Sequence, residues 1–166
     1  MKPILLFLAA SAGLTLAGCY TSDKPLLTDA NSVAPYATIT FTAEGSGKPP
    51  TVLVRKGAAY VVHTSDGDME VRLMPVKDKD NWYVAEMSGF GKDASVQRLF
   101  GYLHVDLGKK TAEAYESDGE TADVGPGLRA CDDSICIDDL TAYIAHAQKK
   151  VDGGEKPDTV FDITVE

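Results

Sequence analysis

Three cysteines carry most of the reactive chemistry that this sequence offers, and the first, Cys19, stands at the end of an apolar segment. Lys2 gives that segment a positive start, Ile4 to Leu16 form its apolar run, and small residues precede the cysteine. This arrangement is typical of an export signal, residues 1–18, followed by a lipid attachment point. The run is interrupted by polar residues and is short of the roughly 18 apolar residues that a membrane-spanning helix needs. A plain secretory signal, which would leave Cys19 as a free thiol, is the other alternative.

The four residues Leu16-Ala17-Gly18-Cys19 resemble the lipobox of bacterial lipoproteins. The resemblance implies that the chain is cut before Cys19, that the cysteine is diacylated, and that its new amino group is often acylated as well. Two or more acyl chains attach a protein stably to a membrane. Tyr20 is not the aspartate that is associated with inner-membrane retention in enteric bacteria, so the resemblance favours the outer membrane of the cell envelope.

Cys131 and Cys136 are separated by four residues, and in an exported protein we expect them to form a disulfide. Closing so short a loop contributes about 2 kcal/mol in the chain-entropy model. A metal site would need further cysteine or histidine ligands, and the nearest histidine, His146, has no recognisable spacing to them. Redox-active pairs usually enclose two residues rather than four.

The segment of residues 117–139 is strongly acidic, and Arg129 is its single base. Its seven acidic residues are Asp118, Glu120, Asp123, Asp132, Asp133, Asp138 and Asp139. We predict that they form a rim for a cationic protein partner, because opposite charge speeds encounter and improves selectivity. Calcium is an alternative, but the EF-hand spacing is absent. The plainer interpretation is a solvated surface next to a helix N-terminus.

The search for catalytic groups yields no constellation. His63, His104 and His146 show no metal-ligand spacing, and no glycine-flanked nucleophilic serine occurs. Convergence of His63 and His104 across a sheet is an alternative, and separate histidines with local hydrogen bonds are the simpler interpretation. The segment 89–92 lacks the remaining residues of a phosphate loop. We therefore expect no enzyme activity, metal or cofactor, and we assign no catalytic or metal-binding residue.

Charge and length limit the function further. The formal charge of the 166 residues is -9, so nucleic acid and anionic lipid surfaces would repel the chain. Removal of residues 1–18 leaves 166 - 18 = 148 residues, which is enough for one domain with a core.

Alternation of apolar and polar residues dominates from Tyr36 onward and predicts β-strands. The expected strands cover residues 36–43, 51–55, 58–64, 69–74, 82–87, 98–107, 111–116 and 159–165. In the longest run, Leu99, Leu103 and Val105 share a face opposite Phe100 and Tyr102. Short turns between these strands indicate a mainly β fold, an antiparallel meander of about eight strands. The pattern leaves open whether it forms a small barrel or a sandwich.

The remaining segments are predicted to be a tether, a loop and a helix. Residues 19–35 are polar and rich in turn-forming residues, which predicts a flexible tether. Residues 36–166 then form a single β-rich domain, in which the acidic segment is a loop pinned by the disulfide. We expect Asp138 to cap a C-terminal helix of residues 140–151, which Gly153 and Gly154 end.

These expectations combine into a lipid-anchored, non-enzymatic binding module whose partner is a cationic protein. The small lysozyme-inhibitor lipoproteins are similar in architecture, and the similarity brings no residues with it. The alternative is a carrier that holds a small apolar or lipid-like ligand in a barrel cavity. The oligomeric state is left open.

Overall fold

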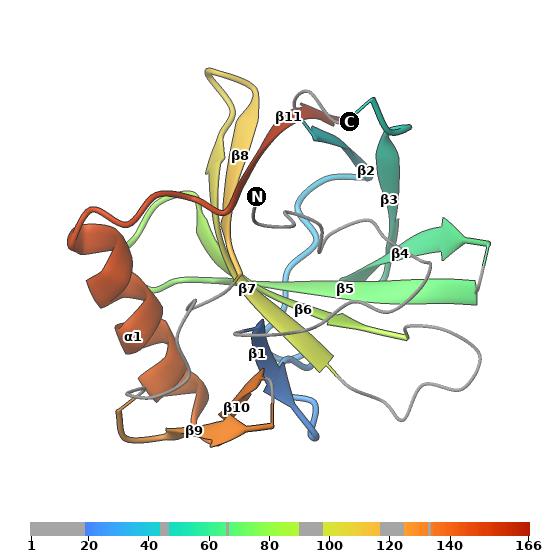
Figure 1. Cartoon of the computed structure of the whole chain (residues 1–166). Helices are drawn as coiled ribbons and strands as arrows, with labels where there is room; N and C mark the ends of the chain where they lie inside the picture. Colours follow the sequence, from blue (N-terminus) through green and yellow to red (C-terminus); the bar gives the residue numbers. More distant parts are fainter. Residues whose placement is uncertain (1–18, 44–46, 66, 90–97, 117–124, 133) are drawn as a thin grey trace.

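A computed structural model describes residues 19–43, 47–65, 67–89, 98–116, 125–132 and 134–166 of the chain (Figure 1). The elements are β1 (Cys19–Ser22), β2 (Thr38–Ala43), β3 (Thr51–Lys56), β4 (Ala59–Thr64), β5 (Gly67–Pro75), β6 (Trp82–Ser88), β7 (Arg98–Asp106), β8 (Thr111–Tyr115), β9 (Leu128–Cys131), β10 (Ser134–Ile137), α1 (Leu140–Asp152) and β11 (Thr159–Val165). No helix in the described ranges is long and apolar enough to cross a membrane.

Eight strands close into an antiparallel barrel (Figure 1). Their order is β6-β5-β4-β3-β2-β11-β8-β7, and β7 pairs back with β6 to close the ring. The predicted mainly β fold of about eight strands with a C-terminal helix is confirmed, and the structure decides for a barrel over a sandwich. Closure pairs the edge strands with each other, so the barrel itself exposes no long edge.

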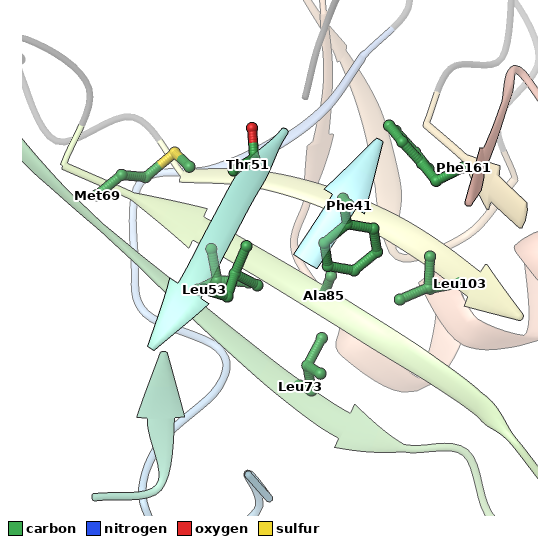
Figure 2. Close-up of a pocket in the computed structure, with 9 residues that line it drawn as sticks. Phe41, Thr51, Leu53, Met69, Leu73, Ala85, Leu103 and Phe161 are labelled. Carbon is green, nitrogen blue, oxygen red and sulfur yellow. The ribbon is translucent and has the colours of Figure 1, made fainter. Parts of the chain in front are cut away.

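Along each barrel strand, inward-facing residues alternate with outward-facing ones, and the inward-facing side chains fill the interior. On β5, Met69, Val71 and Leu73 are buried inside, while Glu70 and Arg72 alternate with them on the outer face. Further interior residues include Ile39, Leu53, Tyr60, Val62, Ala85, Met87, Leu99, Leu103, Ala112, Ala114, Phe161 and Ile163. Side chains from six barrel strands surround the small space that remains (Figure 2).

A second hydrophobic core lies on the outside of the barrel, where β7 contributes its other face. Phe100 and Tyr102 of β7 pack there with Tyr143 of α1 and Ile135 of β10. The two faces predicted for the longest alternating run are therefore both buried, one in each core. This explains why the outer face of β7 carries large aromatic side chains instead of charged ones.

The prediction that residues 19–35 form a free tether is wrong. Residues 19–22 form β1, which is buried between β7 and β10. Downstream, Leu27 is 1% exposed and Val33 forms a bridge with Leu73 of β5. The physical reason is that the few apolar residues of this polar segment are buried against the barrel.

The described part of the acidic segment, residues 125–132 and 134–139, contains two strands where a loop was predicted. Residues Leu128–Cys131 and Ser134–Ile137 form the antiparallel hairpin β9–β10, and β10 pairs in parallel with β1. The apolar residues Leu128, Ile135 and Ile137 are buried in the second core, which fixes this hairpin to the barrel.

The helix α1 is confirmed, but its capping residue is not Asp138. The carboxylate of Asp139 accepts hydrogen bonds from the backbone N–H groups of Thr141 and Ala142, at 2.7 and 3.1 Å. Asp139 is therefore the N-cap. At the other end, the N–H of Gly153 donates to the carbonyl of Lys149.

Candidate functional site

Cys19 lies in a crowded part of the fold as the first residue of β1. Its side chain is 3% exposed, and its Cα partner on β10 is Ser134. Burial raises the pKa of the Cys19 thiol to about 11, and the charges of Glu116 and Asp158 contribute to the rise. A thiol in this state is a poor nucleophile, so the folded chain shows no reactive cysteine at this position.

The structure brings Cys131 and Cys136 to disulfide distance, as their spacing predicts. Their Cα atoms are 5.8 Å apart, across the β9–β10 hairpin. Next to this bridge, the hydroxyl groups of Thr21 and Ser134 form a hydrogen bond of 3.1 Å. The cysteine pair therefore cross-links β9 and β10, and β10 in turn pairs with β1.

The predicted acidic rim is only partly within the described residues, and its members there have separate roles. Asp138 forms an ion pair with Arg129 at 3.1 Å, Asp139 caps α1, and Asp132 is exposed in the hairpin turn. Asp118, Glu120, Asp123 and Asp133 lie outside the described residues. Among the residues described, no group of three histidine, cysteine or acidic side chains is placed to hold a metal ion.

The histidines are placed apart. His63 on β4 contacts Asp68 at 2.7 Å, whereas His104 on β7 stacks on Trp82, with ring centres 4.6 Å apart. Strands β5 and β6 separate these two histidines in the sheet.

The barrel interior contains a cavity of about 30 Å³ with apolar walls (Figure 2). Its lining comprises Phe41, Thr51, Leu53, Met69, Val71, Leu73, Ala85, Leu103 and Phe161. This volume is about that of a single water molecule, whereas pockets for organic ligands measure roughly 300–1,000 Å³. The interior is therefore filled by the chain's own side chains.

A larger hollow, of about 370 Å³, lies on the outer face of β5, β6 and β7. We call it the outer groove. Its lining residues are Pro25, Leu27, Thr28, Asp29, Glu70, Arg72, Glu86, Ser88 and Arg98. The strand residues converge because the register places Arg72 opposite Glu86 and Glu70 opposite Ser88, on the outward side of the alternation. The segment that follows β1 forms the other wall.

The carboxylate of Glu86 connects the segment after β1 to the strands that form the outer groove. One carboxylate oxygen accepts hydrogen bonds from the N–H groups of Leu26 and Leu27, at 2.9 and 2.7 Å. The other oxygen lies 3.2 Å from Nε of Arg98. Burial raises the pKa of Glu86, which is 4% exposed, while these partners oppose the rise. Glu86 thus fixes the N-terminal segment to the barrel.

Arg72 spans the rim of the outer groove between two acidic residues. Its Nε donates to Glu70 at 2.7 Å and its Nη1 donates to Asp29. The hydrogen bond to Asp29 raises the pKa of Arg72, so its positive charge is fixed. The groove therefore presents ordered charges of both signs, with the Asp29 carboxylate well exposed.

A second buried acid, Glu116, lies near Cys19 and was not singled out from the sequence. Glu116 is 7% exposed, and its Oε1 and the hydroxyl oxygens of Tyr102 and Tyr143 are buried without a hydrogen-bond partner among the described residues. Burial, assisted by the charge of Asp158, raises the pKa of Glu116 to about 8. The one signal in the sequence was that Glu116 directly follows the alternating run of β8.

Sequence reasoning also missed the outer groove. The only hint was a charged residue, Glu86, between the apolar residues Ala85 and Met87 of β6. The groove joins β5, β6 and β7 to residues 25–29, and no local pattern reveals such a junction.

Comparisons with protein-family models, curated proteins and solved structures find no match to this chain.

Proposed function

We propose that this chain is a lipid-anchored, non-enzymatic binding module of the bacterial cell envelope, with the outer membrane as its favoured location. The lipobox-like residues Leu16-Ala17-Gly18-Cys19 support the anchor, and the β-barrel is compatible with a binding role. Acyl chains on Cys19 would fix the protein to the membrane.

The observation that carries the binding proposal is the contrast between the two hollows. The barrel interior leaves about 30 Å³, whereas the outer groove offers about 370 Å³ lined by fixed charges. A partner is therefore bound on the outside of the barrel. An interior of this size does not favour the alternative of a carrier for an apolar or lipid-like ligand, because the core would have to open to admit it.

A cationic protein is the proposed partner. The chain carries a formal charge of -9, which steers positively charged proteins toward it. At the outer groove, Asp29 and Glu70 offer exposed carboxylates beside the fixed Arg72. Alternating charges of this kind select one arrangement of partner charges over others.

The test is a pull-down from envelope extract in low and high salt, followed by titration of each captured protein. Lysozyme is a suitable defined probe because it is cationic. We expect binding that weakens as salt rises, since exposed charges are screened. Capture that is independent of salt, or no capture at all, would contradict a charge-guided partner.

Two substitutions locate the binding surface. Asp29→Asn removes a carboxylate at the outer groove, and we expect roughly fivefold weaker binding, as for the loss of one exposed ion pair. Asp162→Asn is the matched control, because Asp162 is an exposed aspartate on β11, remote from the groove in the sheet order. Equal effects of the two substitutions would show that the partner does not use the groove.

The anchor has its own test. Cys19→Ser removes the sulfur to which lipid is attached, so the variant should leave the membrane fraction or stay unprocessed.

Native mass spectrometry of the protein released from the membrane addresses the carrier alternative. A constant co-purified mass of lipid size would favour a carrier over a filled barrel.

A further inference from the structure

We propose that the outer groove is a pocket for one basic side chain, a lysine or an arginine, through which the partner protein is held. The side chain occupies the space over Ser88 and is bound by the carboxylates of Asp29 and Glu70. This inference rests on the proposed cationic partner and adds which group of that partner is bound and which residues bind it.

The groove is hollow because a small residue lies in a row of long ones. Outward-facing residues of β5, β6 and β7 lie side by side, and the β5–β6 register places Glu70 opposite Ser88. The β6–β7 register pairs Met87 with Leu99, so Arg98 lies on the other side of Ser88. The serine side chain is much shorter than these two neighbours, and all three line the groove. Space is therefore left above the serine.

The segment after β1 forms a wall of this space that is already ordered. Pro25, Leu27 and Thr28 belong to the lining. The N–H groups of Leu26 and Leu27 donate to the buried carboxylate of Glu86, at 2.9 and 2.7 Å. A partner that enters the groove therefore does not have to order this wall, which favours binding.

The exposed fractions of the charged side chains decide which sign of charge the groove accepts. The carboxylates dominate the accessible part, since the side chains of Asp29 and Glu70 are 81% and 44% exposed. The side chains of Arg72 and Arg98 are only 19% and 17% exposed. Both guanidinium groups are also paired with carboxylates of the groove. The accessible charge is negative, so the groove favours a cation over an anion.

Both rim carboxylates keep one oxygen for a ligand. Arg72 contacts Oδ1 of Asp29 and Oε1 of Glu70, so the two carboxylates lie close together around one guanidinium group. Within the described part of the chain, Oδ2 of Asp29 and Oε2 of Glu70 have no hydrogen-bond partner. A cation can therefore contact both carboxylates while Arg72 stays in place.

The size and the walls of the groove suit a long side chain better than a metal ion. The volume of about 370 Å³ lies within the range of pockets for organic ligands, roughly 300–1,000 Å³. The described residues contain no group of three histidine, cysteine or acidic side chains that is placed to hold a metal. Lysine and arginine carry a charged head on an apolar stem. The exposed Pro25 offers contact to the stem, and the Ser88 hydroxyl can accept a hydrogen bond from the head.

The first experiment uses N-acetyl-lysine amide and N-acetyl-arginine amide as probes, with N-acetyl-citrulline amide as the neutral counterpart. Each is titrated at low salt into the isotopically labelled protein, and backbone amide shifts are followed by NMR. We expect saturable shifts at Leu27, Asp29 and Ser88 with the cationic probes, with a dissociation constant on the order of 1 mM for ligands of this size. The neutral probe should give none. Equal shifts with the neutral probe, shifts of the same size at the distant Asp162, or no saturable shift would overturn the inference.

The second experiment fills the space without changing a charge. Ser88→Leu should abolish the saturable shifts, because the leucine side chain occupies the site. Thr40→Leu is the matched control and should leave them unchanged: Thr40 is also half-buried and outward-facing, and its strand β2 is four strands from β6 in either direction around the barrel. Unaltered probe binding in a folded Ser88→Leu variant, with folding checked by urea denaturation, would overturn the inference.

A third variant keeps the volume and removes a charge. Glu70→Gln should weaken binding of the cationic probes roughly threefold, as for the loss of one exposed ion pair. It tests the same site if Ser88→Leu does not fold, and unchanged affinity would contradict the role of Glu70.

The pocket and the partner can fail separately. Salt-sensitive capture of a cationic protein that Ser88→Leu leaves unchanged would support the proposed partner and overturn the pocket. Saturable probe binding over Ser88 without capture of any protein would support the pocket and contradict the proposed partner.

Discussion

At the scale of single residues, the buried glutamates Glu86 and Glu116 should have measurable effects on the free energy of unfolding. Glu86 is fully partnered, by two backbone N–H groups and by Arg98. Glu116 has a raised pKa, and no residue in the described part of the chain donates a hydrogen bond to its Oε1. Burial raises the pKa of both glutamates, but the hydrogen bonds and positive charges around Glu86 oppose the rise, whereas the charge of Asp158 adds to it at Glu116.

Glu116 should make the stability depend on pH. Its pKa is about 8 in the folded chain against an ordinary value of 4.5. Its stabilising contribution is fully present below pH 4.5 and is lost as the pH rises toward 8, because the buried group must then ionise. We expect Glu116→Gln to flatten this decline in the free energy of unfolding, measured by urea denaturation at several pH values. Glu113→Gln, a change in a half-exposed residue of the preceding strand β8, is the control, and an equal effect of both would contradict this role.

Removal of Glu86 should detach the segment that walls the outer groove. Glu86→Ala leaves the N–H groups of Leu26 and Leu27 and the Arg98 guanidinium without this carboxylate, and we expect a loss of about 3 kcal/mol in the free energy of unfolding. Hydrogen exchange at Leu26 and Leu27 should accelerate. Glu70→Ala, at the exposed rim, is the control and should leave these amides protected.

Neither glutamate could be identified from the sequence. A buried acid contradicts the usual exposure of charged residues, so the alternation that predicts strands places Glu86 on a solvated face. Only the return of residues 25–29 over that face buries it. The sequence also could not distinguish Asp139, the observed N-cap of α1, from Asp138, the predicted one, because adjacent aspartates give the same helix-start signal.

At the scale of elements, the eight barrel strands and the helix could be predicted because each carries its own periodicity. Strands β1, β9 and β10 could not be predicted from the sequence. Each has four residues, too few to display a period, and their pairing is nonlocal: Thr21 and Ser134 are 113 residues apart. Their stability derives from the second core and not from local pattern.

The helix cap can be tested by exchanging one aspartate at a time. Asp139→Ala removes the acceptor for Thr141 and Ala142 and should lower the free energy of unfolding by about 1 kcal/mol. Asp138→Ala breaks an exposed ion pair with Arg129 and should cost less. A larger effect at Asp138, measured by thermal or urea unfolding, would contradict the assigned cap.

The disulfide should stabilise the hairpin on which β1 rests. The double change Cys131→Ser with Cys136→Ser opens a short loop, and we expect it to cost about 2 kcal/mol in the chain-entropy model. Hydrogen exchange should then rise at β10 and at β1, since the two strands are paired. Unchanged unfolding in the double variant would show that the cysteine pair contributes nothing.

At the scale of the whole molecule, we propose that the barrel is a scaffold whose outer surface binds the partner. Its interior leaves about 30 Å³, its outer face carries a groove with fixed charges, and its formal charge is -9. The acidic composition can be read from the sequence, whereas the export signal of residues 1–18 stays a prediction. The outer groove and the buried strand β1 depend on contacts between distant segments, which no local pattern predicts.

The measurement that tests the central claim most directly is the intact mass of the protein purified from the membrane. We expect a chain that begins at Cys19, carries the added mass of two or three acyl chains, and is two hydrogens lighter than the dithiol form because Cys131 and Cys136 are joined. A full-length or unacylated chain, recovered with free thiols from the cytoplasm, would contradict it.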